Sequence, residues 1–247
     1  MIDVNDSYNV ADKQRELLSM MKDFHEFCIK KNIEYSIIGG TLLGAIREKG
    51  FIPWDDDVDI LMNRSNFTKL EKAASDLDGY YLRELLWVYK IVAKEYADSG
   101  AIDEDTPVLD IFIVDRVPEG AFKKKLKLFN LKMLQGMMKT KINAKKHFSL
   151  ASKAALIVTG TLGKLFSTEK KQDFYDSISK WGNKNDNQPL MICNDIFQSL
   201  HCEYDPNLMN DYTMVNFEDT ELMAISNWAN YLEEQYGDYM TPVRREH

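Results

Sequence analysis

Cysteine is scarce in this sequence of 247 residues, and its scarcity argues against two classes of protein. The three cysteines, Cys28, Cys193 and Cys202, are too few for a disulfide scaffold, and their spacings match no common zinc motif. We therefore expect a reducing compartment and assign the cysteines no role. The first residues, MIDVND, lack the basic and then apolar regions of a secretory signal, so export is not expected.

A long hydrophobic run is also missing. The most apolar segment, residues 154–163, is shorter than the roughly 20 residues that span a bilayer. A formal net charge of -8 argues against general nucleic-acid binding, but this charge is uneven. Residues 121–170 carry twelve lysines and one glutamate, a local charge of +11 that leaves -19 for the remainder. The segment is either a surface for peripheral contact with anionic membrane lipids or the solvated face of a helical insert.

The length and the 45% content of hydrophobic residues predict one globular domain with elaborations, or at most two domains. We divide the chain into a catalytic core at residues 1–118, a largely helical, lysine-rich insert at residues 119–188, and a segment at residues 189–247 that completes the core. From residue spacing we expect helices at 10–31, 41–50, 63–77 and 227–236, and strands at 33–38, 57–62 and 108–114. We also expect a strand or hairpin at 80–93 and a hairpin at 214–223. This order indicates an α/β or α+β fold with a mixed sheet flanked by helices.

The stretch from residue 39 to residue 59, GGTLLGAIREKGFIPWDDDVD, directly follows one of the predicted strands. Gly39 and Gly40 permit the backbone to approach a phosphate, and the N-terminus of the next helix presents amides and a positive dipole end. Thr41 is expected to cap that helix. A tight turn is the alternative for the glycine pair, but a following strand with Asp-x-Asp favours a phosphate site.

Four aspartates at positions 55, 56, 57 and 59 follow within five residues. Each ionised neighbour raises the cost of ionising the next, so a cation is expected among them. In a strand, Asp57 and Asp59 face the same side, roughly 7 Å apart, and Asp110 on another central strand is the natural third ligand. Such oxygen ligands suit one or two Mg²⁺ ions. An acidic surface loop is the alternative, and Asp55 and Asp56 are the weaker candidates.

Other side chains are candidate substrate contacts. Arg47 suits a bidentate phosphate contact, although a surface salt bridge explains it equally well. Trp54 suits stacking on a base or on a quaternary ammonium, with core packing as the commoner fate of tryptophan. Lys90 is a further candidate for phosphate, with a surface lysine as the alternative.

The run GGTLLGAIREKGFIPWDDDVDI resembles the hallmark of the LicD family of phosphotransferases, and it is similar to the core of the nucleotidyltransferase superfamily. The preceding helix LLSMMKDFHEFCIKKNIEY, the segment LDIFIVDRVP and the tail from Val215 onward resemble the family as well. Ser226 stands where the family pattern has a proline, which concerns a turn and not the chemistry. Residues from about 121 to 209 carry no family motif, so the resemblance leaves out roughly one-third of the chain.

The resemblance implies transfer of a phospho-alcohol from a CDP-linked donor to a glycan hydroxyl, with release of CMP. Phosphocholine from CDP-choline is the most frequent case, and relatives of the fukutin type use CDP-ribitol. The implied metal ligands are Asp57, Asp59 and Asp110, and the implied donor-phosphate contacts are Gly39, Gly40, Thr41 and Arg47. A general base is expected among Asp110, Glu218 and Asp219. The Glu218 and Asp219 pair is preferred, because a carboxylate bound to metal keeps a low pKa.

Two alternatives stay open. One is a nucleotidyltransferase that acts on a small molecule, and the other is a non-catalytic module that binds a glycan or a nucleotide. The expected partners are a CDP-alcohol donor and a cell-surface glycan or its lipid-linked precursor, and nucleic acid is not expected. The expected location is the cytoplasm, with peripheral membrane contact through residues 121–170.

Overall fold

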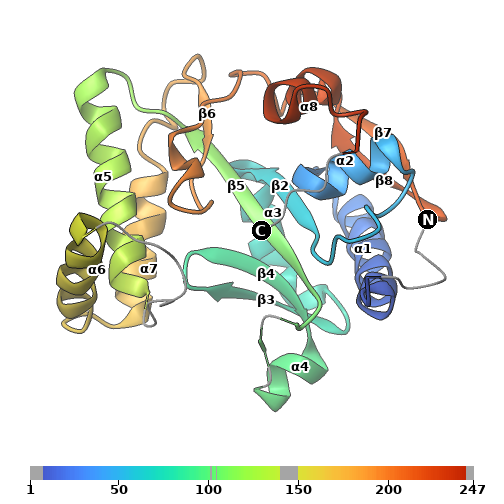
Figure 1. The fold of residues 1–247 in the computed structure, drawn as a ribbon, viewed down its shortest axis with the longest axis horizontal. Helices are drawn as coiled ribbons and strands as arrows, with labels where there is room; N and C mark the ends of the chain where they lie inside the picture. The colour runs from blue at the N-terminus through green and yellow to red at the C-terminus, as the bar shows by residue number, and fades with distance from the viewer. Residues whose placement is uncertain (1–7, 101, 104, 140–149, 243–247) are drawn as a thin grey trace. The chain divides into compact units, whose positions relative to one another are not determined.

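A computed structural model describes residues 8–100, 102, 103, 105–139 and 150–242 (Figure 1). The chain forms two compact units. Unit 1 comprises Met1–Arg83, Tyr89–Ile111 and Asn207–His247, and unit 2 comprises Glu84–Val88 and Phe112–Pro206. The helices and strands are, in chain order, α1 (Ala11–Lys31), β1 (Ser36–Ile37), α2 (Gly39–Arg47), β2 (Asp59–Asn63), α3 (Arg64–Ala73), β3 (Tyr80–Leu85), β4 (Val88–Ala93), α4 (Lys94–Ser99), β5 (Val108–Arg116), α5 (Ala121–Met138), α6 (Leu150–Gly163), α7 (Thr168–Ser179), β6 (Leu190–Ile192), β7 (Tyr212–Phe217), β8 (Thr220–Ile225) and α8 (Trp228–Tyr236).

A sheet flanked by helices forms the framework of unit 1, which confirms the predicted fold class. Its strands lie in the order β1-β2-β5-β4-β3. β1 pairs antiparallel with β2, and β4 pairs antiparallel with β5 so that Lys90 lies opposite Asp110. The β7–β8 hairpin forms a separate sheet that contacts α1, α2 and β1. β2 and β5 are neighbouring interior strands, so Asp59 and Asp110 lie on adjacent strands of the sheet.

Helix α1 packs one face against the rest of unit 1, as its spacing predicts. Leu17, Met21, Phe24 and Cys28 are buried on that face. The helix ends at Asn32, which adopts the left-handed conformation and donates its backbone N–H to a carbonyl of the last turn. This helix also buries the polar side chain of Gln14.

Two local expectations near the glycine pair are wrong. Helix α2 begins at Gly39 with Ile38 as its N-cap and no capping side chain, so Thr41 lies inside the first turn. Strand β2 begins at Asp59, so Asp57 precedes it, and strand alternation does not set the direction of the Asp57 side chain. Both errors arise because the chain enters the helix two residues earlier, and the strand two residues later, than the residue pattern indicates.

Unit 2 contains the end of β5 and the helices of the insert. The end of β5 pairs antiparallel with β6, and α5 packs against both α6 and α7. Helices α5 and α6 pack closely at Gly136, where an added Cβ would lie 2.6 Å from Thr159 Oγ1. Trp87, Leu131 and Tyr175 belong to the buried core of this unit. The insert is therefore largely helical, as predicted, although residues 140–149 lie outside the described part.

Two lysines of unit 2 are buried at the C-terminal ends of helices. Lys127 Nζ donates to the carbonyls of Ser179 at 2.6 Å and Trp181 at 3.0 Å, at the end of α7. Lys171 Nζ donates to the carbonyl of Gly163 at 3.2 Å, at the end of α6. A cation is favourable at such an end, because the last carbonyls of a helix lack partners and carry the negative end of the dipole. These two lysine charges therefore act within the fold.

Candidate active site

The turn at Gly39 and Gly40 places the N-terminus of α2 against two aspartates. Gly39 has a φ of +58°, and a Cβ there would lie 2.7 Å from Asp59 Oδ2. A Cβ on Gly40 would collide with a carboxylate oxygen of Asp55. Thr41 Oγ1 accepts a hydrogen bond of 3.0 Å from the backbone N–H of Asp59. Only residues without a side chain allow this close approach of helix backbone and carboxylates.

The acidic loop at residues 55–57 is held by helix α1. Gln14 is fully buried, and its Nε2 donates to the carbonyl of Asp55 at 2.7 Å. Lys13 Nζ forms an ion pair with Asp56 at 2.9 Å. Sequence reasoning missed both residues. The available signal was Gln14 itself, because a polar side chain on the buried face of an amphipathic helix requires a hydrogen-bond partner.

Asp110 and Lys90 lie opposite each other on β5 and β4, and their side chains form an ion pair. Each side chain keeps 23% of its surface exposed, so solvent reaches the pair. The structure therefore brings Lys90 to one of the predicted metal ligands. A contact between Lys90 and a donor phosphate stays a prediction.

The carboxylates carry more negative charge than the nearby lysines offset. Burial raises the pKa of Asp55 to about 7, with further contributions from the charges of Asp57 and Asp56. The pKa of Asp57 is also raised, by the protein atoms that shield it from water and by the charges of Asp56 and Asp110. Asp57 nevertheless keeps an exposed side chain, so a ligand from solvent can reach it. The loop is thus a region where ionisation is unfavourable without a further cation.

Among the residues that the structure describes, no three His, Cys, Asp or Glu side chains gather closely enough to enclose a metal ion by themselves. The donor set still fits a hard divalent cation chemically. Every candidate ligand is a carboxylate, and Mg²⁺ prefers oxygen while often keeping waters and substrate phosphates as its other ligands. Burial is the largest cause of the raised pKa values of Asp55 and Asp57, and neighbouring aspartates add to it. Asp57, Asp59 and Asp110 stay the predicted ligands.

Arg47 and Trp54 are placed beside other parts of unit 1. Arg47 is the last residue of α2, where its Nη1 donates to the carbonyl of Tyr239 at 3.2 Å and its Nε donates to Glu48 at 2.7 Å. Trp54 is partly exposed, and its ring meets that of Tyr8 edge to face, with centroids 5.8 Å apart. Their contacts with a donor stay predictions.

Glu218 and Asp219 form the turn between β7 and β8. The backbone N–H of Glu218 donates to the carbonyl of Lys49 at 2.7 Å, and its Oε1 accepts from the N–H of Phe51 at 3.1 Å. Asp219 is exposed, and its hydrogen bond and ion pair with Lys22 lower the pKa of its carboxyl. These contacts connect the turn to α1 and to the loop after α2. A role as general base stays a prediction for both residues.

Two comparisons relate this chain to known proteins. A family model described as LicD/FKTN/FKRP, nucleotidyltransferase domain, matches residues 32–132, which include the glycine pair and all three predicted metal ligands. The chain is 28% identical over 250 residues to the lipopolysaccharide cholinephosphotransferase LicD of Haemophilus influenzae, covering 94% of this chain and 91% of that protein. It is 52% identical over 120 residues to the uncharacterized protein RP689 of Rickettsia prowazekii, covering 47% of this chain and 45% of that protein.

Proposed function

We propose that the chain is a phosphotransferase of the LicD family, which moves phosphocholine, or a related phospho-alcohol, from a CDP-linked donor to a glycan hydroxyl; the family-model match and the LicD relative support this. The observation that carries the proposal is the glycine turn, where Asp59 and Asp55 lie against the first residues of α2. The turn brings the N-terminus of α2, proposed to bind phosphate, beside carboxylate oxygens proposed as cation ligands, and a diphosphate donor would use both.

The proposed reaction is an in-line displacement at the phosphorus that carries choline. The acceptor oxygen forms a bond to this phosphorus while the bond to the CMP oxygen breaks, and CMP leaves with the electron pair. The hydroxyl proton passes to a carboxylate base. Asp57, Asp59 and Asp110 would hold Mg²⁺, which supplies neutralisation of charge on the diphosphate and on the leaving oxygen when it is bound.

Other residues bind and orient the donor. The amides of Gly39, Gly40 and Thr41 start α2, and the first turn of a helix leaves such amides without intrahelical partners. They are proposed to receive donor phosphate oxygens, with Lys90 supplying a positive charge from the side of Asp110. Trp54 is proposed to present its ring face to the quaternary ammonium of choline, and Arg47 to contact phosphate.

Release of CMP tests the proposal directly. The purified chain with Mg²⁺ is incubated with CDP-choline, CDP-ribitol or CDP-glycerol, with and without lipopolysaccharide acceptors, and nucleotide products are separated. We expect CMP together with a labelled acceptor. Absence of turnover with every donor and acceptor would argue for a binding module, whereas pyrophosphate formed from a nucleoside triphosphate would support the nucleotidyltransferase alternative.

An Asp57→Asn substitution separates the site from the fold. We expect loss of transfer with nearly unchanged folding, because Asp57 is exposed and its ionised form is disfavoured by neighbouring charges. Measured transfer by this variant at the unsubstituted rate would contradict the metal-ligand assignment. Glu218→Gln and Asp219→Asn test the base, since loss of a base changes the pH profile of the rate and loss of a turn contact does not.

The proposed location follows from the proposed donor. We place the reaction in the cytoplasm, where a nucleotide-linked donor is available, and we take a cell-surface glycan or its lipid-linked precursor as the acceptor. None of the described helices has the length and apolar character that crossing a bilayer requires. We propose separately that contact with a membrane is peripheral, through the lysine-rich segment at residues 121–170.

A further inference from the structure

Helix α5 of unit 2 exposes a stripe of large apolar side chains. Phe122 is 77% exposed, Leu126 39% and Phe129 63%. Their spacing of four and three residues puts them on one face of the helix. Single exposed apolar side chains are common on proteins, but a continuous stripe with two phenylalanines marks a surface that contacts another apolar phase.

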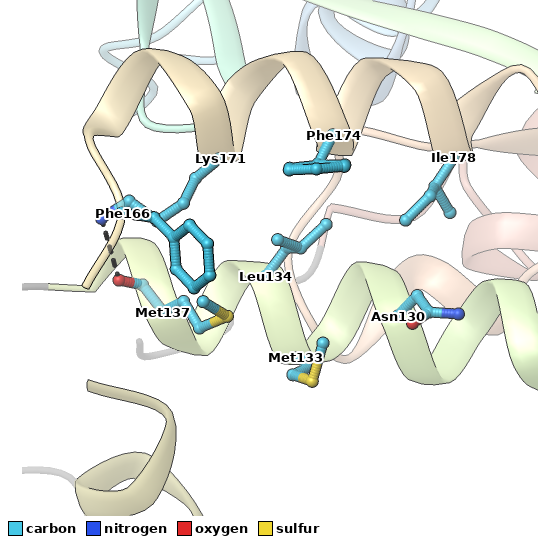
Figure 2. A pocket seen from close by; sticks show the side chains of 8 residues that line it. All are labelled: Asn130, Met133, Leu134, Met137, Phe166, Lys171, Phe174 and Ile178. Atoms are coloured by element: carbon cyan, nitrogen blue, oxygen red, sulfur yellow. Dashed lines mark hydrogen bonds between the residues drawn. The ribbon is translucent and has the colours of Figure 1, made fainter. Parts of the chain in front are cut away.

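The stripe runs into an apolar groove between α5 and α7. The groove has a volume of about 250 Å³, and its lining residues are Asn130, Met133, Leu134, Met137, Phe166, Lys171, Phe174 and Ile178. Figure 2 shows Leu134 and Met137 of α5 on one side of it and Phe174 and Ile178 of α7 on the other. Phe166 and Phe174 are about half exposed. Met133, one turn beyond Phe129, links the stripe to this groove.

Few polar atoms in the groove are available to a polar ligand. The Lys171 ammonium, drawn in Figure 2 with its bond to Met137, donates to the carbonyls of Met137 at 3.3 Å and Gly163 at 3.2 Å. Its charge therefore acts within the fold, and the groove walls are otherwise almost entirely apolar. Such a groove suits hydrocarbon better than a sugar or a nucleotide.

Exposed lysines accompany the apolar stripe. Lys123 and Lys125 lie beside Phe122 on α5, and Lys164 precedes Leu165, which is 75% exposed. They belong to the segment with a local charge of +11 in a chain of net charge -8. A surface that combines aromatic side chains with lysines matches the boundary between acyl chains and anionic headgroups, where a helix lies in the plane of the membrane.

We propose that this lipid-facing surface, formed by the α5 stripe with Lys123 and Lys125 and by the α5–α7 groove, docks on an anionic bilayer. The phenylalanines enter the acyl boundary, the lysines meet headgroup phosphates, and the groove accepts the end of an acyl chain. Charge complementarity selects a bilayer over a second copy of this chain, because two copies would bring like-charged lysines together. The inference goes beyond the proposed reaction, since it uses no residue of the acidic site.

Vesicle co-sedimentation of the full chain tests the proposal. Vesicles of phosphatidylcholine alone are compared with vesicles that also contain phosphatidylglycerol, at low and high salt. We expect binding to the anionic vesicles that high salt weakens. The pair Phe122→Ser with Phe129→Ser is expected to lower the partition coefficient at least about tenfold, because each buried phenylalanine contributes that much. The pair Lys123→Glu with Lys125→Glu is expected to lower it by a similar factor.

Matched controls come from α1 of unit 1. Ile29 is 54% exposed and Lys30 is exposed, so Ile29→Ser and Lys30→Glu make the same chemical changes outside the surface and should leave vesicle binding unchanged. Absence of salt-sensitive binding by the unsubstituted chain, or equal binding by all variants, would overturn the proposal. So would a dimer in solution that the phenylalanine substitutions dissociate, because a second copy would then occupy the surface.

The result is distinguishable from a failure of the proposed reaction. With a glycan acceptor that carries no lipid, the phenylalanine variants should release CMP at the unsubstituted rate, since all the exposed side chains changed lie in unit 2. Vesicle binding without CMP release would leave the docking surface standing and remove the proposed activity. CMP release without vesicle binding would do the reverse.

Discussion

Gly39 offers a sharp test of the site, because a matched glycine exists in the same unit. Gly39 and Gly79 both have a positive φ, of 58° and 79°. A Cβ at Gly79 would meet no atom within 4 Å, whereas a Cβ at Gly39 would lie 2.7 Å from Asp59 Oδ2. Alanine at either position carries the same backbone strain, but only Gly39→Ala disturbs a carboxylate.

The size of each effect follows from these distances. Left-handed backbone costs a residue with a Cβ about 1 to 2 kcal/mol, so both substitutions should lower the free energy of unfolding by that amount. In Gly39→Ala, Asp59 Oδ2 has to retreat by about 0.7 Å to reach ordinary contact at 3.4 Å. Because a displacement of about 1 Å at a catalytic site can cost a hundredfold in rate, we expect Gly39→Ala to lose between about ten- and a hundredfold in transfer.

The assay is the initial rate of CMP release under conditions where urea denaturation shows both variants to be folded. Gly79→Ala should keep a rate within about twofold of the unsubstituted chain, because its Cβ would meet no atom within 4 Å and would therefore displace no carboxylate. Rates close to that of the unsubstituted chain in both variants would refute the reasoning, since the position of Asp59 would then not matter. A comparable loss in both would assign the effect to backbone strain.

Three further predictions concern charge and positioning. The pKa of Asp55 in the folded protein, about 7, exceeds the ordinary value of 3.8. The contribution of Asp55 to stability is therefore full below pH 3.8 and is lost as the pH rises to about 7. Asp55→Asn should raise the urea midpoint of the metal-free protein at about pH 8 but not at about pH 4. Lys127→Met should destabilise unit 2 by about 3 kcal/mol in urea denaturation, while exposed Lys123→Met changes stability by less than about 0.5 kcal/mol. Gln14→Leu should lower CMP release, because the Asp55 carbonyl loses its donor, and a variant with normal rate but reduced stability would limit Gln14 to a structural role.

Much of the framework of unit 1 could be predicted from the sequence. The apolar spacing of α1, the glycine pair and the carboxylates on β2 and β5 are each determined by short-range rules of spacing and conformation, and the structure has these elements in the predicted order. Asn63 illustrates this local character, because it begins the expected helix at residues 63–77 and its side chain caps α3 by accepting from the N–H of Asn66 at 2.9 Å. The division of the chain at residues 118 and 188 stays a prediction.

Contacts between residues far apart in the chain could not be predicted from the sequence. Gln14 and Lys13 hold the acidic loop from a helix some forty residues earlier, and no local pattern pairs a given lysine with a given aspartate. The direction of the Asp57 side chain could not be predicted for a related reason. Strand alternation predicts side-chain direction only inside a strand, and the pairing with β1 that defines β2 begins after Asp57.

The lysine-rich segment shows why composition alone leaves two interpretations open. Lys127 and Lys171 lie in or beside this segment, and both donate to helix-terminal carbonyls instead of meeting solvent or lipid. Lys123 and Lys125 are exposed beside an apolar stripe. A count of charges gives each lysine the same weight, whereas the fold divides them by burial, so only the exposed ones can contribute to an external electrostatic contact.

A cation at the acidic loop would act beside two lysines that already form ion pairs. Lys13 pairs with Asp56 and Lys90 pairs with Asp110, so the protein offsets part of the negative charge itself. Even with both lysines in place, the pKa values of Asp55 and Asp57 are raised. Burial is the largest cause of both shifts and neighbouring carboxylates add to it, so a bound cation would favour the ionised forms. A cation that binds Asp110 would compete with the Lys90 ammonium for the carboxylate, and this competition would leave the ammonium available for a donor phosphate.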